Sequence, residues 1–316
     1  MLSLIFPSGG KEKKFIGLTV YRDDDAFIHE VAKYLEIESR DSIEIRTVAA
    51  EGNQDLQNEQ AAAFIREGAS AIIVNTADRT ASGLIIEKCR MNDIPLVFFN
   101  RQPLKDDMMK WEKTYYVGGL GGAGGSIAAD YFSSYWADHP ELDRNNDGIL
   151  QFVLIKGEPG HQDTELRTEY LLNTLSANGI RLDKLDEANG RWMRDNARGV
   201  MNRFLSVYPD SIEAVFCNND EMALGAIDAL KEAGWFDNGK YMPVTGCDGT
   251  PAGMEALEDG TMLCTVLNDA ENQAKAIYAL AVDLVDGKTP EGEIAGYPMD
   301  GHYIWIPYQA LIREGE

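Results

Sequence analysis

Short continuous apolar runs alternate along the chain with longer stretches in which apolar residues recur every three or four positions. The first pattern is typical of strands buried on both faces, and the second is typical of amphipathic helices. The predicted strands are 15–21, 43–49, 71–75, 94–100, 115–119, 149–157, 180–186 (the weakest), 212–218, 242–248, 262–268 and 302–308. The predicted helices are 27–37, 59–68, 83–93, 124–136, 165–179, 197–208, 222–235, 252–260 and 271–287. Strands that alternate with helices predict an α/β protein with parallel sheets covered on both faces.

The number of strands is too large for one sheet of ordinary size, which has about five or six strands. The alternation is interrupted at the glycine-rich segment GGLGGAGG, residues 118–125, and then starts again. We therefore predict two doubly wound lobes of similar architecture. The glycine run resembles a phosphate-binding loop only weakly, because it lacks the GK[ST] ending. A crossing between the lobes or a tight helix start is the better interpretation.

The chain has 316 residues and a formal net charge of −23. This acidity argues against binding to nucleic acid and disfavours an anionic membrane surface, since both require clustered Lys and Arg. No apolar run is long enough to span a bilayer, and LSLIF near the start is too short to direct export. Of the four cysteines, Cys217, Cys247 and Cys264 lie in apolar, strand-like runs, so we interpret them as small buried hydrophobes.

Polar side chains follow many of the predicted strands. In open α/β sheets, ligands bind beyond the carboxyl ends of the strands, so these positions are candidates for a shared site. A single Asn or Asp after a strand is more often a helix N-cap, but six such strand ends are difficult to explain by capping alone. The candidates are Asp25, Asn100, His161, Asp163, Arg167, Asn219, Asp248 and Asn268.

Carboxylates, carboxamides, an imidazole and a guanidinium can all make the paired hydrogen bonds that neighbouring sugar hydroxyls require. Phe27 and Trp192 add aromatic surfaces that suit the apolar faces of a pyranose. Ordinary packing remains the alternative for Trp192. Three of the aspartates could instead form the carboxylate pair of a glycosidase, and His161 with Asp163 could mimic a base and its orienter. No serine elbow, Walker loop or HExxH motif supports catalysis, so we predict a protein that is not an enzyme.

The segment DRNNDGILQ begins as an EF-hand calcium loop does. Asp143, Asn145 and Asp147 are spaced by two, and Gly148 follows at the sharp turn. The helix that normally closes such a loop is absent, because Leu154, at loop position twelve, lies within a predicted strand. On spacing alone, a solvated Asn/Asp/Gly turn is an equal alternative.

The chain resembles the glucose/galactose-binding proteins of bacterial ABC transporters from about Phe15 to Pro307. The strongest stretches are VYRDDDAF, VFFNRQP, KGEPGHQDTELRT, NNDEMALGAIDALK, TGCDGTP and TVLNDAENQAKA. The resemblance implies a type I periplasmic binding protein: two Rossmann-like lobes, joined by three crossings, that hinge closed on D-glucose or D-galactose. It implies an N-terminal lobe of residues 1–118 plus 269–303 and a C-terminal lobe of residues 119–268 plus 304–316.

The resemblance also assigns roles to particular residues. It implies that the eight polar candidates hydrogen-bond the sugar and that Phe27 and Trp192 stack on its two faces, the segment around Trp192 being the most divergent. It implies a structural Ca²⁺ ion held by a nine-residue loop and a distant glutamate. The implied ligands are Asp143, Asn145, Asp147, the carbonyl of Ile149, Gln151 and Glu213.

The implied partner is a membrane permease, and a chemoreceptor or sensor kinase is a further expected partner. The implied location is extracytoplasmic. Because the first cysteine is Cys89, residues 1–14 contain no lipobox, and whether the protein is free or lipid-anchored stays open. Three alternatives also stay open: a sensory ectodomain for another monosaccharide, a sugar-responsive repressor core (without a basic helix-turn-helix before residue 15) and a glycosidase.

Overall fold

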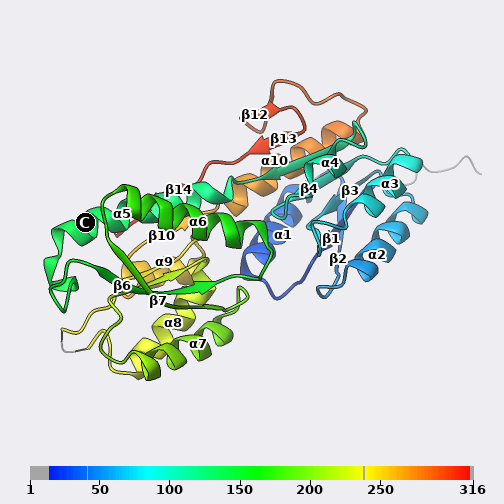
Figure 1. Ribbon diagram of the computed structural model, residues 1–316. Helices are drawn as coiled ribbons and strands as arrows, with labels where there is room; N and C mark the ends of the chain where they lie inside the picture. The colour runs from blue at the N-terminus through cyan, green and yellow to red at the C-terminus, as the bar shows by residue number, and fades with distance from the viewer. Residues whose placement is uncertain (1–13, 41, 238, 314–316) are drawn as a thin grey trace, which may run out of the picture.

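The computed structural model describes residues 14–40, 42–237 and 239–313. The predictions made for the first 13 residues, about export and lipid attachment, lie outside this part of the chain. Within it, two groups of alternating strands and helices lie side by side and are joined by connecting segments (Figure 1). No helix among the described residues is long and apolar enough to cross a membrane.

The first sheet has eight strands in the order β11-β12-β13-β5-β4-β3-β1-β2. Six of them, from β13 to β2, pair in parallel, whereas β11 and β12 add an antiparallel hairpin at one edge. The strands are β1 (Phe15–Val20), β2 (Glu44–Ala49), β3 (Ala71–Val74), β4 (Leu96–Phe99), β5 (Thr114–Gly118), β11 (Glu293–Ile294), β12 (Tyr297–Asp300) and β13 (Tyr303–Trp305). Its helices are α1 (Ala26–Ser39), α2 (Gln54–Arg66), α3 (Gly83–Met91), α4 (Lys105–Met108) and α10 (Ala270–Val285).

The second group contains a four-stranded parallel sheet in the order β7-β6-β8-β9 and an antiparallel pair, β10 with β14. Single bridges from Thr245 to Cys264 and from Asp248 to Leu267 connect the two. The strands are β6 (Leu150–Lys156), β7 (Leu182–Asn189), β8 (Ala214–Cys217), β9 (Val244–Thr245), β10 (Thr265–Leu267) and β14 (Gln309–Leu311). The helices are α5 (Gly121–Asp138), α6 (Gln162–Ala177), α7 (Arg194–Val207), α8 (Asp220–Glu232) and α9 (Pro251–Glu258), with a short 3₁₀ turn, η1 (Pro140–Leu142).

The predicted α/β class with parallel sheets is confirmed. The central strands read as continuous apolar runs because helices cover both faces, and each sheet accordingly has two clusters of buried side chains, one on each face. All four cysteines are buried and unpaired, which confirms the interpretation of Cys217, Cys247 and Cys264 as small buried hydrophobes. Burial raises the pKa of the Cys89 thiol to about 12, so that thiol stays protonated at neutral pH.

Several expected elements differ in extent. The predicted strand 242–248 is reduced to β9, and the hairpin β11–β12, the strand β14 and the short helix α4 were not predicted. These elements are two to four residues long, so they carry too few side chains to produce a readable period. The weak prediction over 180–186 corresponds to β7, which lies at a sheet edge and has exposed and half-buried positions but no fully buried one.

The chain passes between the two groups three times: after β5, after β10 and after β13. The first and third passages lie side by side, since the amide of Ile306 donates to the carbonyl of Gly118 at 2.9 Å. A Cβ on Gly119 would lie 2.4 Å from the Tyr308 ring, so this close approach requires glycine. The residue ranges assigned to the two lobes in the sequence analysis stay a prediction.

The glycine cluster serves the two purposes predicted for it. Gly118 and Gly119 lie at the crossing, and α5 begins at Gly121. A Cβ on Gly125 would lie 2.2 Å from the carbonyl oxygen of Arg167, so the absent side chain lets α5 and α6 pack backbone to backbone. The cluster therefore sets the position of α6, which carries two of the candidate site residues.

We expect Gly125→Ala to lower the free energy of unfolding by about 1–3 kcal/mol, because the added methyl group must force α5 away from α6. Gly199→Ala is the matched control. Gly199 is also helical, but a Cβ there would meet nothing within 4 Å, so the change should stabilise the protein by about 0.5–1 kcal/mol. Urea unfolding of both variants measures the difference, and equal effects at the two positions would contradict this account of the helix packing.

Candidate functional site

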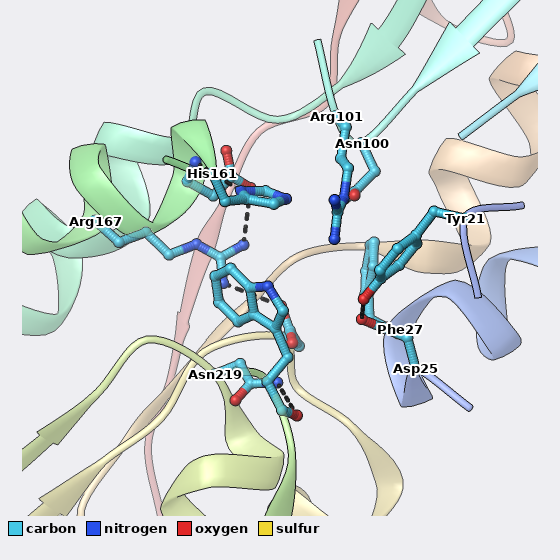
Figure 2. A pocket seen from close by; sticks show the side chains of 11 residues that line it. Tyr21, Asp25, Phe27, Asn100, Arg101, His161, Arg167 and Asn219 are labelled. Carbon is cyan, nitrogen blue, oxygen red and sulfur yellow. Dashed lines mark hydrogen bonds and ion pairs between the residues drawn. The ribbon is translucent and has the colours of Figure 1, made fainter. Parts of the chain in front are cut away.

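One pocket lies between the two groups of elements and gathers residues that are far apart in the sequence (Figure 2). It holds about 320 Å³ of space free of protein atoms, part of which is open to solvent. Little of this space is wide enough for a water molecule, so the pocket is a thin slot. It is lined by Tyr21, Asp25, Phe27, Asn100, Arg101, His161, Asp163, Arg167, Trp192, Asn219 and Asp248.

Nine of the ten predicted contact residues therefore line one slot. The tenth, Asn268, is buried directly behind it: its Nδ2 donates to Asp248 at 3.4 Å, and its Oδ1 accepts from Gln273 at 2.6 Å. Asn268 thus supports Asp248 rather than lining the slot. Tyr21 and Arg101 also line the slot but were not predicted. Tyr21 directly follows β1, and Arg101 lies two residues after the end of β4. A search beyond the first polar residue after each strand would have found Arg101, whereas Tyr21 was counted as the last residue of the predicted strand 15–21.

The sequence leaves open whether a strand-end Asp or Asn caps a helix or contacts a ligand. Asp25 and Asn219 each cap a helix and also line the slot. Oδ1 of Asp25 caps α1 through the amide of Ile28 at 3.0 Å, while Oδ2 accepts from the Tyr21 hydroxyl at 2.6 Å. Oδ1 of Asn219 caps α8, and its Nδ2 donates to the carbonyl of Trp192 at 3.3 Å. Each cap bond fixes the side-chain rotamer at the slot, so these groups are oriented before any ligand arrives.

His161 is a neutral hydrogen-bond donor to the slot. Its Nδ1 accepts from the amide of Asp163 at 3.1 Å and caps α6. Burial, reinforced by the neighbouring arginines Arg101, Arg167 and Arg79, holds the pKa of His161 well below its usual range. A neutral imidazole that accepts at Nδ1 carries its proton on Nε2, so His161 can donate one hydrogen bond to a ligand oxygen.

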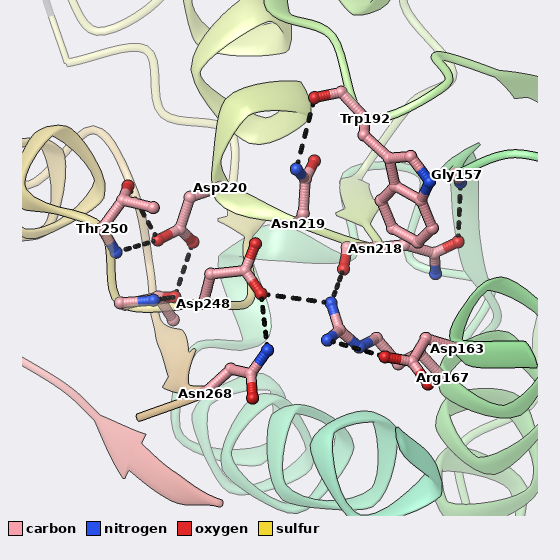
Figure 3. Close-up of polar contacts among 12 residues, drawn as sticks. Gly157, Asp163, Arg167, Trp192, Asn218, Asn219, Asp220, Asp248, Thr250 and Asn268 are labelled. Carbon is pink, nitrogen blue, oxygen red and sulfur yellow. Dashed lines mark hydrogen bonds and ion pairs between the residues drawn. The ribbon is translucent and has the colours of Figure 1, made fainter. Parts of the chain in front are cut away.

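Arg167 is the centre of a buried polar network (Figure 3). Nη1 donates to the carbonyl of Asn218 at 2.7 Å and to Asp248 at 3.4 Å, and Nη2 donates to Asp163 at 3.4 Å and to Tyr308 at 3.1 Å. Burial raises the pKa of both aspartates, and the guanidinium opposes that rise. Arg167 therefore helps two buried carboxylates to remain hydrogen-bond acceptors.

The aromatic side chains Phe27 and Trp192 are buried and belong to opposite groups of elements. His161 meets the Trp192 indole edge-on, with ring centres 5.0 Å apart. A Cβ on Gly157 would lie 2.2 Å from the indole, so glycine is needed there for the ring to occupy its place. The slot thus has aromatic side chains from both groups.

Three slot residues have positive φ angles, which glycine adopts more readily than any other residue: Asn100 at 58°, Trp192 at 67° and Asp248 at 125°. Such conformations cost on the order of 1–3 kcal/mol each and persist only where the surrounding structure enforces them. Hydrogen bonds to Asn100 from Asn75 and Tyr116, and to Asp248 from Arg167 and Asn268, provide that enforcement. The slot thus holds three of the nine described non-glycine residues with positive φ, and the other six lie elsewhere in the chain.

The predicted calcium loop and Glu213 lie together. Glu213 accepts from the amides of Arg144 at 2.8 Å and Gln151 at 3.0 Å, and Asp143 accepts from the amides of Asp147 at 3.1 Å and Gly148 at 2.8 Å. Gly148 has a φ of +67°, as the sharp turn requires. Burial and the nearby Asp143 raise the pKa of Glu213. The set of carboxylate and carboxamide oxygens suits a hard cation.

The loop also differs from a formed metal site. Within residues 14–40, 42–237 and 239–313, no three His, Cys, Asp or Glu side chains converge as a metal centre. The amide nitrogens of Asn145 and Gln151 both donate to Asp147, at 3.0 and 2.9 Å. Ligation would require both amides to turn so that their oxygens replace their nitrogens. These residues carry the types of oxygen ligand that Ca²⁺ prefers, and the presence of the ion stays a prediction.

Two groups of alternating strands and helices around a thin, polar, aromatic-walled slot define a two-lobed solute-binding protein. Residues 16–289 match the periplasmic binding protein domain, and the chain belongs to that family. The proteins of this family are extracytoplasmic and bind solutes without transforming them, so the prediction that the chain is not an enzyme is confirmed.

The individual relatives are likewise named as proteins that bind sugars or other solutes. The chain is 36% identical, over 302 residues, to the D-galactose/methyl-galactoside binding periplasmic protein MglB of Haemophilus influenzae, covering 95% of this chain and 89% of that protein. An ABC transporter solute binding protein from Bacillus halodurans, solved with bound myo-inositol, superposes with a TM-score of 0.79 at 25% identity and covers 97% of each chain. A periplasmic solute binding protein from Actinobacillus succinogenes, solved with bound D-allose, has a TM-score of 0.80 at 21% identity and supports the fold alone; it covers 96% of this chain and 98% of that one.

Proposed function

We propose that this chain binds a neutral hexose, D-galactose or D-glucose, between its lobes and delivers it to the membrane permease of an ABC transporter. The observation that carries the proposal is the convergence of nine predicted contact residues on one slot. Carboxylate acceptors, a neutral imidazole donor and a guanidinium can pair with hydroxyls of either polarity, and Phe27 and Trp192 offer apolar faces to a flat ring.

The relative from Haemophilus influenzae, named for D-galactose and methyl-galactoside, favours a hexose over a pentose. The choice between the two hexoses is left open, because they differ at one hydroxyl and a carboxylate such as Asp25 accepts from either epimer. In our proposal, each lobe contributes contacts, so the ligand favours the closed arrangement through its differential affinity. The permease recognises that closed form, and a chemoreceptor is a further proposed partner that binds it.

Calorimetric titration of the purified protein with galactose, glucose, ribose, xylose and myo-inositol tests this proposal. We expect both hexoses, or one of them, to bind about tenfold or more tightly than the pentoses, because the pentoses lack a hydroxymethyl group and leave its buried partners unpaired. The cyclitol is included because of the myo-inositol in the relative from Bacillus halodurans. Tighter binding of a pentose or of myo-inositol, or no heat with any of the five, would reject the proposal.

We also propose that the loop from Asp143 to Gln151, together with Glu213, holds a structural Ca²⁺ ion. The support is the contact of Glu213 with the amides of Arg144 and Gln151, which brings the distant carboxylate to the loop. Asp143, Asn145, Asp147 and Gln151 would provide side-chain oxygens, and Ile149 would provide its carbonyl oxygen. The positive charge of the ion would attract the carboxylates of the loop and of Glu213, which directly precedes β8. The ion would thereby link the loop to the start of that strand.

Glu213→Gln is expected to lower the melting temperature in calcium by about 5–10 °C, the shift that corresponds to losing a bound stabilising ion in a protein of this size. A chelator should lower the melting temperature of the wild type by a similar amount and should not change that of the variant. Glu141→Gln, a change at an exposed neighbouring residue, is the control and should respond to chelator as the wild type does. An equal chelator effect on the wild type and Glu213→Gln would remove Glu213 from the ion.

A further inference from the structure

A buried carboxylate lies behind the slot. Asp220 is the first residue of α8, directly after the slot residue Asn219, and its side chain is fully buried. Burying a carboxylate is unfavourable unless hydrogen bonds replace the water that it loses. Burial accordingly raises the pKa of Asp220, whereas hydrogen bonds from Thr265 and Thr250 oppose that rise. Asp220 lies outside the lining of the slot, so any role in binding acts through a neighbouring residue.

Both carboxylate oxygens of Asp220 bind groups next to the slot residue Asp248. Oδ2 accepts from the amide of Thr250 at 2.8 Å and from its hydroxyl at 3.2 Å (Figure 3). Oδ1 accepts from the hydroxyl of Thr265 at 2.6 Å, and the oxygen of that hydroxyl accepts from the amide of Gly249 at 3.3 Å. The two amides that follow Asp248 are therefore both tied to Asp220, one directly and one through Thr265.

Two glycines make room for this carboxylate. A Cβ on Gly246 or on Gly253 would lie 2.3 Å from an oxygen of Asp220, so only glycine lets the chain approach so closely at these two positions. Gly246 directly follows β9, and Gly253 lies in the first turn of α9. The amide of Asp220 also donates to the carbonyl of Cys247 at 2.7 Å. The chain between β9 and α9 therefore packs closely around Asp220.

Asp248 has a backbone conformation that requires such support. Its φ of 125° is unfavourable, and the surrounding structure must offset that cost. The amide of Asp248 donates to the carbonyl of Val266 at 2.8 Å, and its carbonyl accepts from the amide of Asn268 at 3.1 Å. These bonds hold Asp248 itself, and the bonds to Asp220 hold the two peptide groups that follow. Because the allowed side-chain rotamers depend on φ and ψ, fixing this backbone also fixes the direction of the Asp248 carboxylate.

We propose that Asp220 is a positioning residue of the binding site, which holds the backbone of Asp248 in the conformation that directs the Asp248 carboxylate into the slot. Asp220 acts through the hydroxyl of Thr265 and the amide of Thr250 and does not touch the ligand. These bonds are made entirely by the protein, so the Asp248 carboxylate is oriented before binding and little affinity is lost in ordering it. The proposal rests on the proposed function, since a hexose is the expected ligand of Asp248.

The test measures hexose affinity by calorimetry for Asp220→Asn and Thr265→Val. The first change replaces one acceptor oxygen with a donor, and the second replaces the hydroxyl with a methyl group. Each is expected to weaken binding by about tenfold or more. Thr265→Ser keeps the hydroxyl and should bind within about twofold of the wild type. Thr261→Val is the matched control and should also stay within about twofold, since the buried Thr261 hydroxyl donates at 2.6 Å to a different aspartate, Asp259, at the end of α9.

Hydrogen exchange of the ligand-free protein measures the positioning directly. The amides of Gly249 and Thr250 should exchange about tenfold faster in Asp220→Asn and Thr265→Val than in the wild type, because both variants loosen their acceptors. The amides of β4, in the first group of elements, should exchange at unchanged rates. Thermal unfolding establishes whether each variant is folded, and Thr265→Val decides the question if Asp220→Asn does not fold.

Affinities within twofold of the wild type in both variants would overturn the proposal while leaving the proposed function intact. A loss in Thr265→Ser or Thr261→Val equal to that in Thr265→Val would also overturn it. Unchanged exchange at the amides of Gly249 and Thr250 would overturn it whatever the affinities. If the wild type binds no hexose, the proposed function fails instead, and the exchange rates alone decide whether Asp220 holds this part of the chain.

Discussion

Replacing Arg167 with methionine is expected to weaken hexose binding by about two to four orders of magnitude. The guanidinium is buried and contacts Asp163, Asp248, Tyr308 and the carbonyl of Asn218. Methionine fills a similar volume but leaves two buried carboxylates without a neutralising partner. Breaking a buried pair by removing one partner costs about 3–5 kcal/mol, and each 1.4 kcal/mol corresponds to a factor of ten.

Calorimetry with galactose and glucose measures this loss, and thermal unfolding reports whether Arg167→Met still folds. The matched control is Arg198→Met, which removes an exposed pair with Glu232 on the surface of α7 and α8. Exposed pairs contribute about 0–1 kcal/mol, so the control should bind as the wild type does. If Arg167→Met kept its affinity within tenfold, the buried network would not be part of the binding site.

Trp192→Ala is expected to weaken hexose binding about thirtyfold or more, while the protein remains folded. The indole lines the slot, meets His161 edge-on and occupies the space that Gly157 leaves free. Its removal takes away one wall of a thin slot and the support of the His161 ring. Buried aromatic anchors of this kind commonly contribute 2 kcal/mol or more to binding.

Trp235→Ala is the control for this change, since Trp235 packs beside Arg144 in a surface pocket lined by none of the slot residues. It should leave hexose affinity unchanged, whatever it does to stability. Fluorescence or calorimetric titration of both variants gives the comparison. Equal affinity in Trp192→Ala and the wild type would mean that the indole is packing and not a wall of the binding site.

The long elements could be predicted because their pattern is redundant. A strand such as β6, buried along nearly its whole length, reads as a continuous apolar run, and α8 repeats its buried face over three turns. The hairpin β11–β12 and the strand β9 were missed or shortened because two to four residues cannot establish a period. Their positions come from pairing with a neighbouring strand, which is a long-range interaction.

The candidate site could be predicted from a topological rule combined with the family resemblance. Polar residues after parallel strands converge because the carboxyl ends of those strands share one edge. The rule does not reveal that Asn268 stands behind Asp248, or that Arg101, one residue beyond a predicted contact, reaches across the slot. Those arrangements depend on rotamers and on contacts between the two groups of elements, which sequence spacing does not encode.

The sequence by itself determined the α/β class, the order of the elements and the chemical types of the residues that meet at the slot, because each of these follows from local periodicity and from residue identity. The tertiary structure alone decided which atoms of those residues cap helices and which face the slot. It also decided that Gly119, Gly125 and Gly157 leave space that neighbouring groups occupy, and that Arg101 and Glu158 form an ion pair. The physical reason is that these features are distances between segments far apart in the chain, and only the packed fold fixes such distances.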